Sequence, residues 1–148
     1  MRAVNKLSLQ IEEGEFVGFL GPNGAGKTTF LKILSGIMWP TSGEAKVMGF
    51  RPWERDYRFL RQIAIVMGQK NQLWWDLPAF DSFNLLKEIY GISYSDYKKN
   101  LEEMVETLGM KDLITKRLRN MSLGERMKCE LTASFLHSPK VIFLDEPT

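Results

Sequence analysis

Eight consecutive residues near the start of the chain have the types and spacing of a phosphate-binding loop. They run Gly21-Pro22-Asn23-Gly24-Ala25-Gly26-Lys27-Thr28. Glycines let successive backbone N–H groups point inward, and a following helix adds partial positive charge at its N-terminus. We expect Lys27 to reach the β- and γ-phosphates of a nucleotide, Thr28 to bind Mg²⁺ and Thr29 to add a phosphate contact. A plain glycine-rich turn with a surface lysine is the alternative.

Two carboxylates near the other end of the chain form a second candidate. Asp145 and Glu146 follow the apolar run at 141–144. The carboxyl ends of parallel strands meet at one edge of a sheet, so we expect this pair beside the phosphate loop. Asp145 would hold Mg²⁺, directly or through water, and Glu146 would orient or deprotonate an attacking water. Taken alone, the pair would also suit a charged strand end in solvent.

A third motif, Ser122-Leu123-Gly124-Glu125, precedes a helical pattern. Serine followed three residues later by glutamate is a capping box, in which each side chain accepts a hydrogen bond from the other residue's backbone N–H. This motif therefore predicts a helix that begins directly after Ser122, and it has a purely structural interpretation.

Short apolar runs predict the strands that would position these residues. Residues 16–20, 63–67 and 141–144 lack period-two alternation, which is typical of strands buried on both faces of a parallel sheet. Residues 7–12 and 44–47 alternate apolar and polar side chains, which indicates half-exposed, antiparallel strands. The first buried run leads directly into the phosphate loop.

Helical patterns occupy most of the remaining chain. One covers residues 30–37, directly after the phosphate loop, and two more lie within 78–119, where no strand signal occurs. Ser95 is a candidate cap for the second of these two helices. Alternating strands and helices predict an α/β fold with a mainly parallel sheet, interrupted by a helical insert.

Composition excludes several classes of protein. The 148 residues carry a formal charge of +2, far from the strongly basic balance of proteins that bind mainly nucleic-acid phosphates. No apolar stretch is long enough to span a bilayer, and the first residues do not form a secretory signal. The single cysteine, Cys129, fits a reducing compartment and a packing role, and we assign no catalytic role to His137.

The order and spacing of these motifs resemble the nucleotide-binding subunit of ATP-binding cassette (ABC) transporters. The family's signature turn is Leu-Ser-Gly-Gly-Gln, and the corresponding turn here is Met121-Ser122-Leu123-Gly124-Glu125. The serine and the second glycine match, whereas Leu replaces the first glycine and Glu replaces the glutamine. The likeness extends over nearly the whole chain, and the segment from Gln69 to Asp76 is most similar to ABC-2-type exporters.

The resemblance implies a P-loop NTPase core with N-terminal antiparallel strands and a helical subdomain. It divides the chain into part of the ATPase core (1–75), the helical subdomain (76–120), and the signature turn with its helix and acidic strand (121–148). The implied function is Mg²⁺-dependent hydrolysis of ATP by a cytoplasmic subunit on the membrane's cytoplasmic face, which energises a transporter.

Roles for further residues also follow from the resemblance. Gln69 would contact Mg²⁺ and the attacking water, and the signature turn would cap the γ-phosphate held by a second ATPase subunit in a head-to-tail dimer. Glu125 brings a negative charge toward that triphosphate, which Arg126 or Lys128 could offset. Trp74 and Trp75 would face a transmembrane permease subunit; alternatively, they pack between the core and the helical insert.

Other functions remain alternatives. One is an ABC-type ATPase that transports nothing and acts on ribosomes or nucleic acid, although we expect no nucleic-acid partner. A small-molecule kinase or a GTPase would not need the signature turn, and the guanine-reading pattern Asn-Lys-x-Asp is missing from the sequence. A catalytically inert piece of such a cassette is a third alternative.

The resemblance also implies that the chain is incomplete at both ends. The sequence stops just after Glu146, and the aromatic residue that stacks on adenine, the Leu-Asp-bearing loop and the later histidine of the family have no counterpart in it. We therefore expect the isolated 148 residues to be poorly stable and nearly inactive, with exposed strand edges.

Overall fold

A computed structural model describes residues 4, 7–68 and 72–146 of the chain. The chain divides into two compact units, Met1–Asp56 and Tyr57–Thr148, and each is described by itself. Within the described ranges, no helix combines the length and the apolar character needed to cross a bilayer.

The second unit contains a pair of parallel strands, β1 (Ile63–Met67) and β2 (Val141–Asp145). Their register pairs Ile63 with Val141 at one end and Met67 with Asp145 at the other. Both strands were expected from their apolar runs, and their parallel pairing confirms that expectation. β1 is the more buried of the two, whereas Leu144 on β2 remains 37% exposed.

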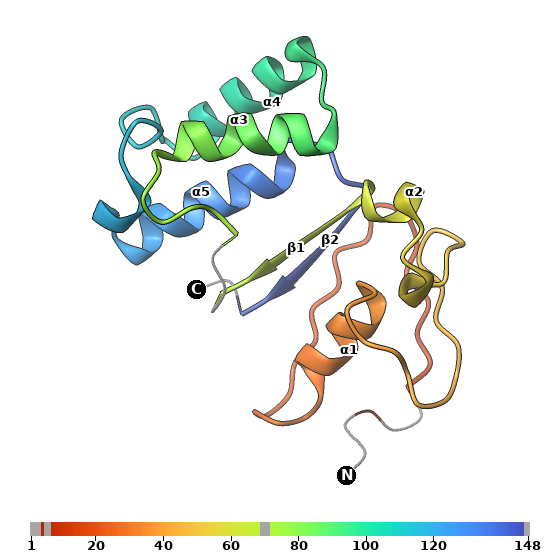
Figure 1. Cartoon of the computed structure of the whole chain (residues 1–148). Helices are drawn as coiled ribbons and strands as arrows, with labels where there is room; N and C mark the ends of the chain where they lie inside the picture. Colours follow the sequence, from red (N-terminus) through yellow and green to blue (C-terminus); the bar gives the residue numbers. More distant parts are fainter. Residues whose placement is uncertain (1–3, 5–6, 69–71, 147–148) are drawn as a thin grey trace. The chain divides into compact units, whose positions relative to one another are not determined.

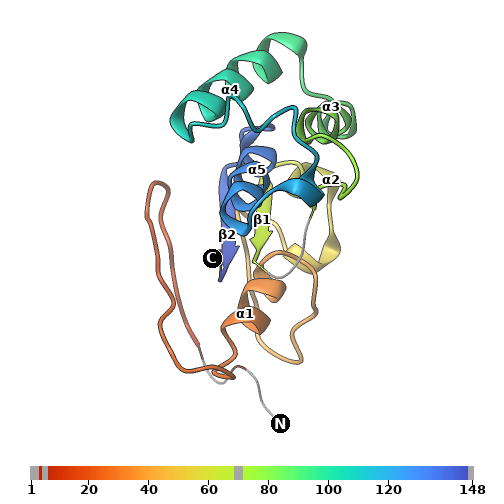
Figure 2. The ribbon, with the colours of Figure 1, turned by 90° about the vertical axis from the view of Figure 1, so that its left-hand side faces the viewer.

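One long helix of the second unit packs on this strand pair, and two more pack on that helix. They are α3 (Ala79–Tyr90), α4 (Tyr94–Thr107) and α5 (Leu123–Phe135), with the short α2 (Tyr57–Leu60) leading into β1 and the turn η2 (Leu118–Asn120) leading toward α5. α5 contacts β1, α3 and α4, and it lies between the strands and the α3–α4 hairpin (Figures 1 and 2). The two helices expected in the insert are therefore confirmed.

The core of the second unit joins the helical insert to α5. Its members are apolar side chains from α3, α4, η2 and α5 and from the segments between them: Leu73, Ala79, Phe83, Tyr97, Leu101, Met110, Leu118, Met121, Cys129, Ala133 and Leu136. Burial of each large apolar side chain contributes about 1.5–3 kcal/mol, so this shared core holds α5 against the insert.

The first unit contains α1 (Lys27–Leu34) and the 3₁₀ turn η1 (Pro52–Glu54). The strands expected at 7–12, 16–20 and 44–47 do not form; residues 7–20 run out and turn back near Gly14 without a ladder, and only an isolated bridge joins Val47 to Phe50 (Figure 2). A strand requires a hydrogen-bonded neighbour, and no described residue supplies one here.

Side chains that were expected to lie inside a sheet are exposed as a result. Phe16 is 93% exposed and Leu20 is 99% exposed, whereas Phe19 packs edge-on against Phe30 of α1 with ring centroids 5.1 Å apart. The run at 16–20 therefore has the apolar composition of a buried strand but is not hydrogen-bonded to a neighbouring strand in the described part of the chain.

Two local expectations need smaller corrections, and a third is confirmed. The helix after the phosphate loop ends at Leu34, so Ile37 lies outside it and is 50% exposed. Ser93, not Ser95, caps α4, because the Oγ of Ser93 accepts a hydrogen bond from the Asp96 N–H at 3.1 Å. The capping box before α5 is confirmed.

Candidate functional site

The phosphate loop has a curled backbone that passes directly into α1. Gly24 and Gly26 both have left-handed φ angles, 83° and 92°, which side chains with a Cβ rarely adopt. The Ala25 N–H donates to the Pro22 carbonyl at 3.2 Å, and the Phe30 N–H donates to the Gly26 carbonyl at 2.8 Å. The loop is therefore a tight turn whose last glycine is the N-cap of the helix.

Lys27 folds back across this loop. Its ammonium donates to the carbonyl of Gly21 at 2.6 Å and to that of Pro22 at 3.0 Å. Residues 21–25 are exposed, and the first turn of α1 contains no acidic side chain that would repel an anion. The cation is thus held at the exposed helix N-terminus, as the binding of a polyphosphate requires.

The acidic pair lies at the end of β2. Asp145 is the last residue of the strand and stands opposite Met67, and the Gly68 N–H donates to the Asp145 carbonyl at 3.1 Å. Glu146 is exposed and has a φ of 46°, a left-handed conformation that is uncommon for a residue with a Cβ.

The candidate residues divide between the two units. Residues 21–29 belong to the first unit, whereas Asp145, Glu146 and the signature turn (Ser122-Leu123-Gly124-Glu125) belong to the second. Gln69 lies outside the described residues. The register of β1 and β2 brings the described neighbour of Gln69, Gly68, beside Asp145.

Each unit contains an oxygen donor of a type that suits magnesium. Mg²⁺ bound with a phosphate takes one or two protein oxygens and completes its shell with phosphate oxygens and water. A threonine at the start of α1 and one strand-end carboxylate supply such oxygens. No group of three or more acidic, His or Cys side chains suited to a metal occurs among the described residues, and a magnesium nucleotide does not need one.

The signature turn begins α5 and is held by reciprocal hydrogen bonds. The Glu125 N–H donates to Ser122 Oγ at 3.3 Å, and the Ser122 N–H donates to Glu125 Oε2 at 2.6 Å. Ser122, Leu123 and Gly124 are exposed, so this helix N-terminus faces solvent. Exposed N–H groups and a serine hydroxyl at a helix start suit contact with an anion.

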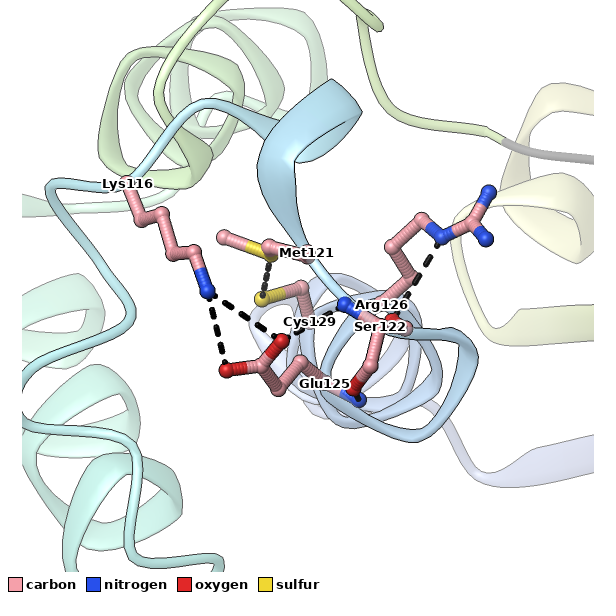
Figure 3. Close-up of polar contacts among 6 residues, drawn as sticks. All are labelled: Lys116, Met121, Ser122, Glu125, Arg126 and Cys129. Carbon is pink, nitrogen blue, oxygen red and sulfur yellow. Dashed lines mark hydrogen bonds and ion pairs between the residues drawn. The ribbon is translucent and has the colours of Figure 1, made fainter.

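Glu125 is paired with a cation that the sequence did not indicate. Lys116 Nζ lies 3.1 Å from Oε1 and 3.3 Å from Oε2 of Glu125 (Figure 3). The hydrogen bond from the Ser122 backbone, followed by those from Lys116 and the Ser122 side chain, lowers the pKa of Glu125. The expected partners make other contacts: Lys128 Nζ donates to the Leu108 carbonyl at 2.8 Å, and Arg126 lies over a tryptophan ring.

The segment at 72–80 is attached to the region around the signature turn mainly through backbone groups. The N–H groups of Arg119 and Leu118 donate to the carbonyls of Trp75 at 3.0 Å and Leu77 at 3.2 Å. Phe80 N–H donates to the carbonyl of Ile114 at 2.9 Å. Residues 75–80 therefore run beside 114–119 as an irregular antiparallel pair, which includes the bridge between 78 and 117.

A buried glutamate of α5 secures the start of this segment. Oε1 of Glu130 accepts hydrogen bonds from the N–H groups of Gln72 at 2.9 Å and Leu73 at 3.3 Å, and the residue is only 4% exposed. Burial raises the pKa of Glu130, although the two backbone hydrogen bonds act in the opposite direction. Glu130 therefore ties α5 to the chain that follows Gln69.

The two tryptophans of the segment are half-exposed. Trp74 is 41% exposed and Trp75 is 45% exposed, and the Arg126 guanidinium lies 4.9 Å from the ring centre of Trp75. The alternative position, between the core and the insert, is taken by Leu73, which is 5% exposed. Both rings therefore present apolar surface, and that of Trp75 lies against Arg126 of α5.

Cys129 and His137 have structural positions. Cys129 is fully buried, and its Sγ lies 3.7 Å from Met121 Sδ. His137 stacks on Tyr90 with ring centroids 4.0 Å apart, and its Nε2 lies 3.0 Å from the Ile63 carbonyl oxygen. The packing role expected for Cys129 is confirmed.

Sequence reasoning missed three features around the signature turn: the Lys116–Glu125 pair, the Arg126–Trp75 contact and the Glu130 anchor. Each joins residues from separate segments and depends on how the loops fold. The sequence contained a signal for the Glu130 anchor alone. Glu130 lies among the apolar positions of its helix, and an acidic residue that is buried there requires a partner.

Sequence comparison finds extensive similarity to known proteins. The ABC transporter family model matches residues 4–148. The chain is 32% identical to the ABC transporter ATP-binding protein NatA of Bacillus subtilis, over 100% of the chain and 60% of NatA. It is also 32% identical to the bacitracin transport ATP-binding protein BcrA of Bacillus licheniformis, over 99% of the chain and 47% of BcrA.

Solved structures show the same relationship. A dimeric ATP-binding cassette in a post-hydrolysis state, bound to ADP and Pi, matches 95% of the chain and 64% of its own length, with a TM-score of 0.79 and 27% identity. The ATP-binding subunit of an ABC transporter matches 86% of the chain and 53% of its own length, with a TM-score of 0.77 and 26% identity. The chain spans less than two thirds of each of these proteins, and its sequence and its fold both show that it belongs to the ABC transporter family.

Proposed function

We propose that the full-length protein containing this chain binds and hydrolyses ATP and that it energises transport across a membrane. The observation that carries the proposal is the phosphate loop: its curled backbone holds the Lys27 ammonium at the exposed N-terminus of α1. Family membership and the transport names of NatA and BcrA support the same function.

Each residue of the phosphate loop has a specific task in this proposal. Backbone N–H groups of residues 21–26 surround the α- and β-phosphates, and Lys27 exchanges its contacts with the Gly21 and Pro22 carbonyls for the β- and γ-phosphates. Thr29 makes a further phosphate contact. Positioning and charge stabilisation of this kind supply most of the rate of phosphoryl transfer, which needs little covalent help from protein.

Three side chains would hold Mg²⁺: Thr28, Asp145 and Gln69. When bound, the ion would supply positive charge that stabilises the phosphate oxygens during the reaction. Glu146 orients the attacking water and accepts its proton, and Gln69 helps to position that water. General-base assistance of this kind contributes about 10²- to 10⁴-fold to rate.

The partners follow from the exposed signature turn. We infer that two subunits associate head to tail, so that Ser122 and Gly124 of one subunit contact the γ-phosphate held by the other. The dimeric state of the similar ADP- and Pi-bound cassette supports this arrangement. Closure and opening of the dimer would then drive a transmembrane permease, which Trp74 and Trp75 contact from the cytoplasmic side.

The same proposal assigns the parts of the chain. Residues 1–75 contribute to the ATPase core, 76–120 form the helical subdomain, and 121–148 provide the signature turn, its helix and the acidic strand. We assign the protein to the ABC-2 exporter type on the segment from Gln69 to Asp76. Low activity of the isolated 148 residues remains a prediction.

Two substitutions in the full-length protein test the ATPase roles. Glu146→Gln should bind ATP but hydrolyse it at least about tenfold more slowly, because the water loses its base. Lys27→Ala should lose nucleotide affinity, because the phosphates lose their main cation. A fluorescent ATP analogue measures binding, and release of inorganic phosphate measures hydrolysis.

Matched controls come from an exposed pair on α4. Lys98 and Glu102 are 60% and 69% exposed, with 3.9 Å between their charged atoms. Lys98→Ala and Glu102→Gln make the same chemical changes and should leave binding and turnover unchanged. Wild-type turnover by Glu146→Gln would exclude the general-base role, and unchanged affinity in Lys27→Ala would exclude the phosphate loop as the nucleotide site.

A further inference from the structure

The negative charge of Glu125 at the start of α5 is neutralised by a nearby lysine. Glu125 occupies the third position of the helix, inside the exposed turn that the proposed function directs at a polyphosphate. A helix N-terminus carries roughly half a positive charge, which a single carboxylate exceeds. Glu125 alone would therefore make this end of α5 net negative and repel the nucleotide of a second subunit.

Lys116 supplies the missing positive charge. It lies in the segment between α4 and η2, and its ammonium approaches both carboxylate oxygens of Glu125, at 3.1 Å and 3.3 Å (Figure 3). The sum of a half-charge, one carboxylate and one ammonium is roughly half a positive charge, so the pair restores the sign that anion contact needs. Both side chains are partly exposed, at 37% for Lys116 and 29% for Glu125.

Other cations near the turn make different contacts. Arg126 places its guanidinium over the Trp75 ring at 4.9 Å, and its Nε donates to the Ser122 carbonyl at 3.5 Å. Lys128 donates to the Leu108 carbonyl at 2.8 Å. Among the described residues, Lys116 is the cation recorded in an ion pair with Glu125.

The contact also fixes the geometry of the turn. Oε2 of Glu125 accepts both the Ser122 N–H, at 2.6 Å, and a bond from Lys116. The ammonium thus orients the carboxylate that holds the N-cap residue, and it draws negative charge toward the side of α5 that faces Lys116. An exposed ion pair adds little to folding stability, so a purely structural role would leave only a small effect when Lys116 is replaced.

We propose that Lys116 is a positioning residue for nucleotide in trans: paired with Glu125, it keeps the signature turn cationic enough to engage the ATP held by a second copy of this chain. The inference rests on the proposed function, because it requires ATP-dependent association of two subunits. Lys116 is assigned to the nucleotide of the second subunit, so its loss should act on association and leave binding in cis unchanged.

The test is a double-mutant cycle in the full-length Glu146→Gln protein, in which slow hydrolysis preserves ATP. The variants are Lys116→Met, Glu125→Gln and the combination, with Lys98→Met on α4 as the matched loss of an exposed lysine. Analytical ultracentrifugation with Mg-ATP gives the protein concentration at half-association, a nucleotide analogue gives affinity at concentrations where the protein is monomeric, and thermal unfolding gives stability.

We expect Lys116→Met to raise the concentration at half-association by about fivefold or more, with unchanged monomer affinity and melting temperature. Glu125→Gln leaves the turn more positive and should associate at least as tightly as the parent. Lys116→Met combined with Glu125→Gln should regain the parent's association, because the positive half-charge of the helix then stands without a carboxylate. Lys98→Met should match the parent.

Two results would overturn the inference alone: normal association by Lys116→Met, or a combined variant as impaired as Lys116→Met. A parent protein that binds no ATP, or that binds it without associating, would overturn the proposed dimeric ATPase and this inference together. The parent's own behaviour therefore separates failure of the function from failure of the role of Lys116.

Discussion

Cys129 illustrates how burial controls the chemistry of a single residue. Desolvation raises the pKa of its thiol to about 11, with smaller contributions from the carboxylates of Glu130 and Glu125. The thiolate is the form that reacts with alkylating reagents. A fully buried thiol with this pKa is an inert packing group at neutral pH. Its rate of alkylation therefore measures whether the surrounding core is folded.

We predict that Cys129 in the native full-length protein reacts with iodoacetamide at pH 8 at least about a hundredfold more slowly than in urea-denatured protein. The pKa rises by about two units from 9.0, which removes most of the thiolate, and burial blocks access to the remainder. Mass spectrometry of the peptide that contains Cys129 measures both rates. Equal rates would contradict the burial of this side chain.

Residues in local motifs could be assigned from the sequence, whereas their charged neighbours could not. The phosphate loop and the Asp145–Glu146 pair each lie within a few consecutive positions, so spacing alone identifies them as candidates. Lys116 meets Glu125 only because the chain turns through η2 between them. Nothing in the spacing of these two residues distinguishes that contact from pairing with Arg126 or Lys128, which is why the sequence pointed to the wrong cations.

The sequence predicted helices and strands correctly where the elements that they pair with or pack against lie in the second unit. β1 and β2 pair with each other, and the apolar faces of α3, α4 and α5 meet in one core, so pattern and structure agree. The apolar run at 16–20 has an equally clear pattern and forms no strand, because backbone pairing depends on a neighbour that hydrophobicity does not specify. Helix ends followed capping residues, with errors of a few positions.

At the element scale, Gly36 fixes how η1 packs on the end of α1. Its φ is 76°, and a Cβ added there would overlap the carbonyl oxygen of Pro52. We predict that Gly36→Ala destabilises the full-length protein by about 2 kcal/mol or more, because it adds steric overlap to an unfavourable backbone conformation. Urea denaturation measures the change in the free energy of unfolding.

Gly43→Ala is the matched control for this prediction. Gly43 has a φ of 91°, but a Cβ there would meet no heavy atom within 4 Å. Its replacement should cost only the conformational part, about 1 kcal/mol. Equal losses for the two variants would show that the close approach of Pro52 to Gly36 is not a constraint in solution.

At the scale of the whole molecule, His137 joins three elements of the second unit. It follows the end of α5, stacks on Tyr90 of α3 and contacts the carbonyl of Ile63 at the start of β1. Burial lowers the pKa of His137 from 6.5, and the charge of Arg61 acts in the same direction, against the hydrogen bond with Ile63. The folded protein therefore favours the neutral imidazole.

The sign of the resulting pH dependence follows directly. Above the ordinary pKa of 6.5, His137 is neutral in both the folded and the unfolded state. As the pH falls below that value, His137 binds a proton in the unfolded chain but stays neutral in the folded protein, so protonation favours unfolding. We predict that the wild-type protein loses stability between pH 7.5 and 5.5, and that His137→Phe, which keeps a ring against Tyr90, loses less over this range. Urea midpoints at the two pH values measure the difference, and identical losses would contradict the assignment.

The attachment of residues 72–80 also has a consequence for how this surface can diverge. Most of the hydrogen bonds that hold the segment use its main chain: the N–H groups of Gln72 and Leu73 donate to Glu130, and the carbonyls of Trp75 and Leu77 accept from the backbone near η2. Main-chain groups are the same in every residue except proline. The half-exposed side chains of the segment can therefore be exchanged during evolution while the loop keeps its path, so this surface can change its chemistry without a change in the attachment.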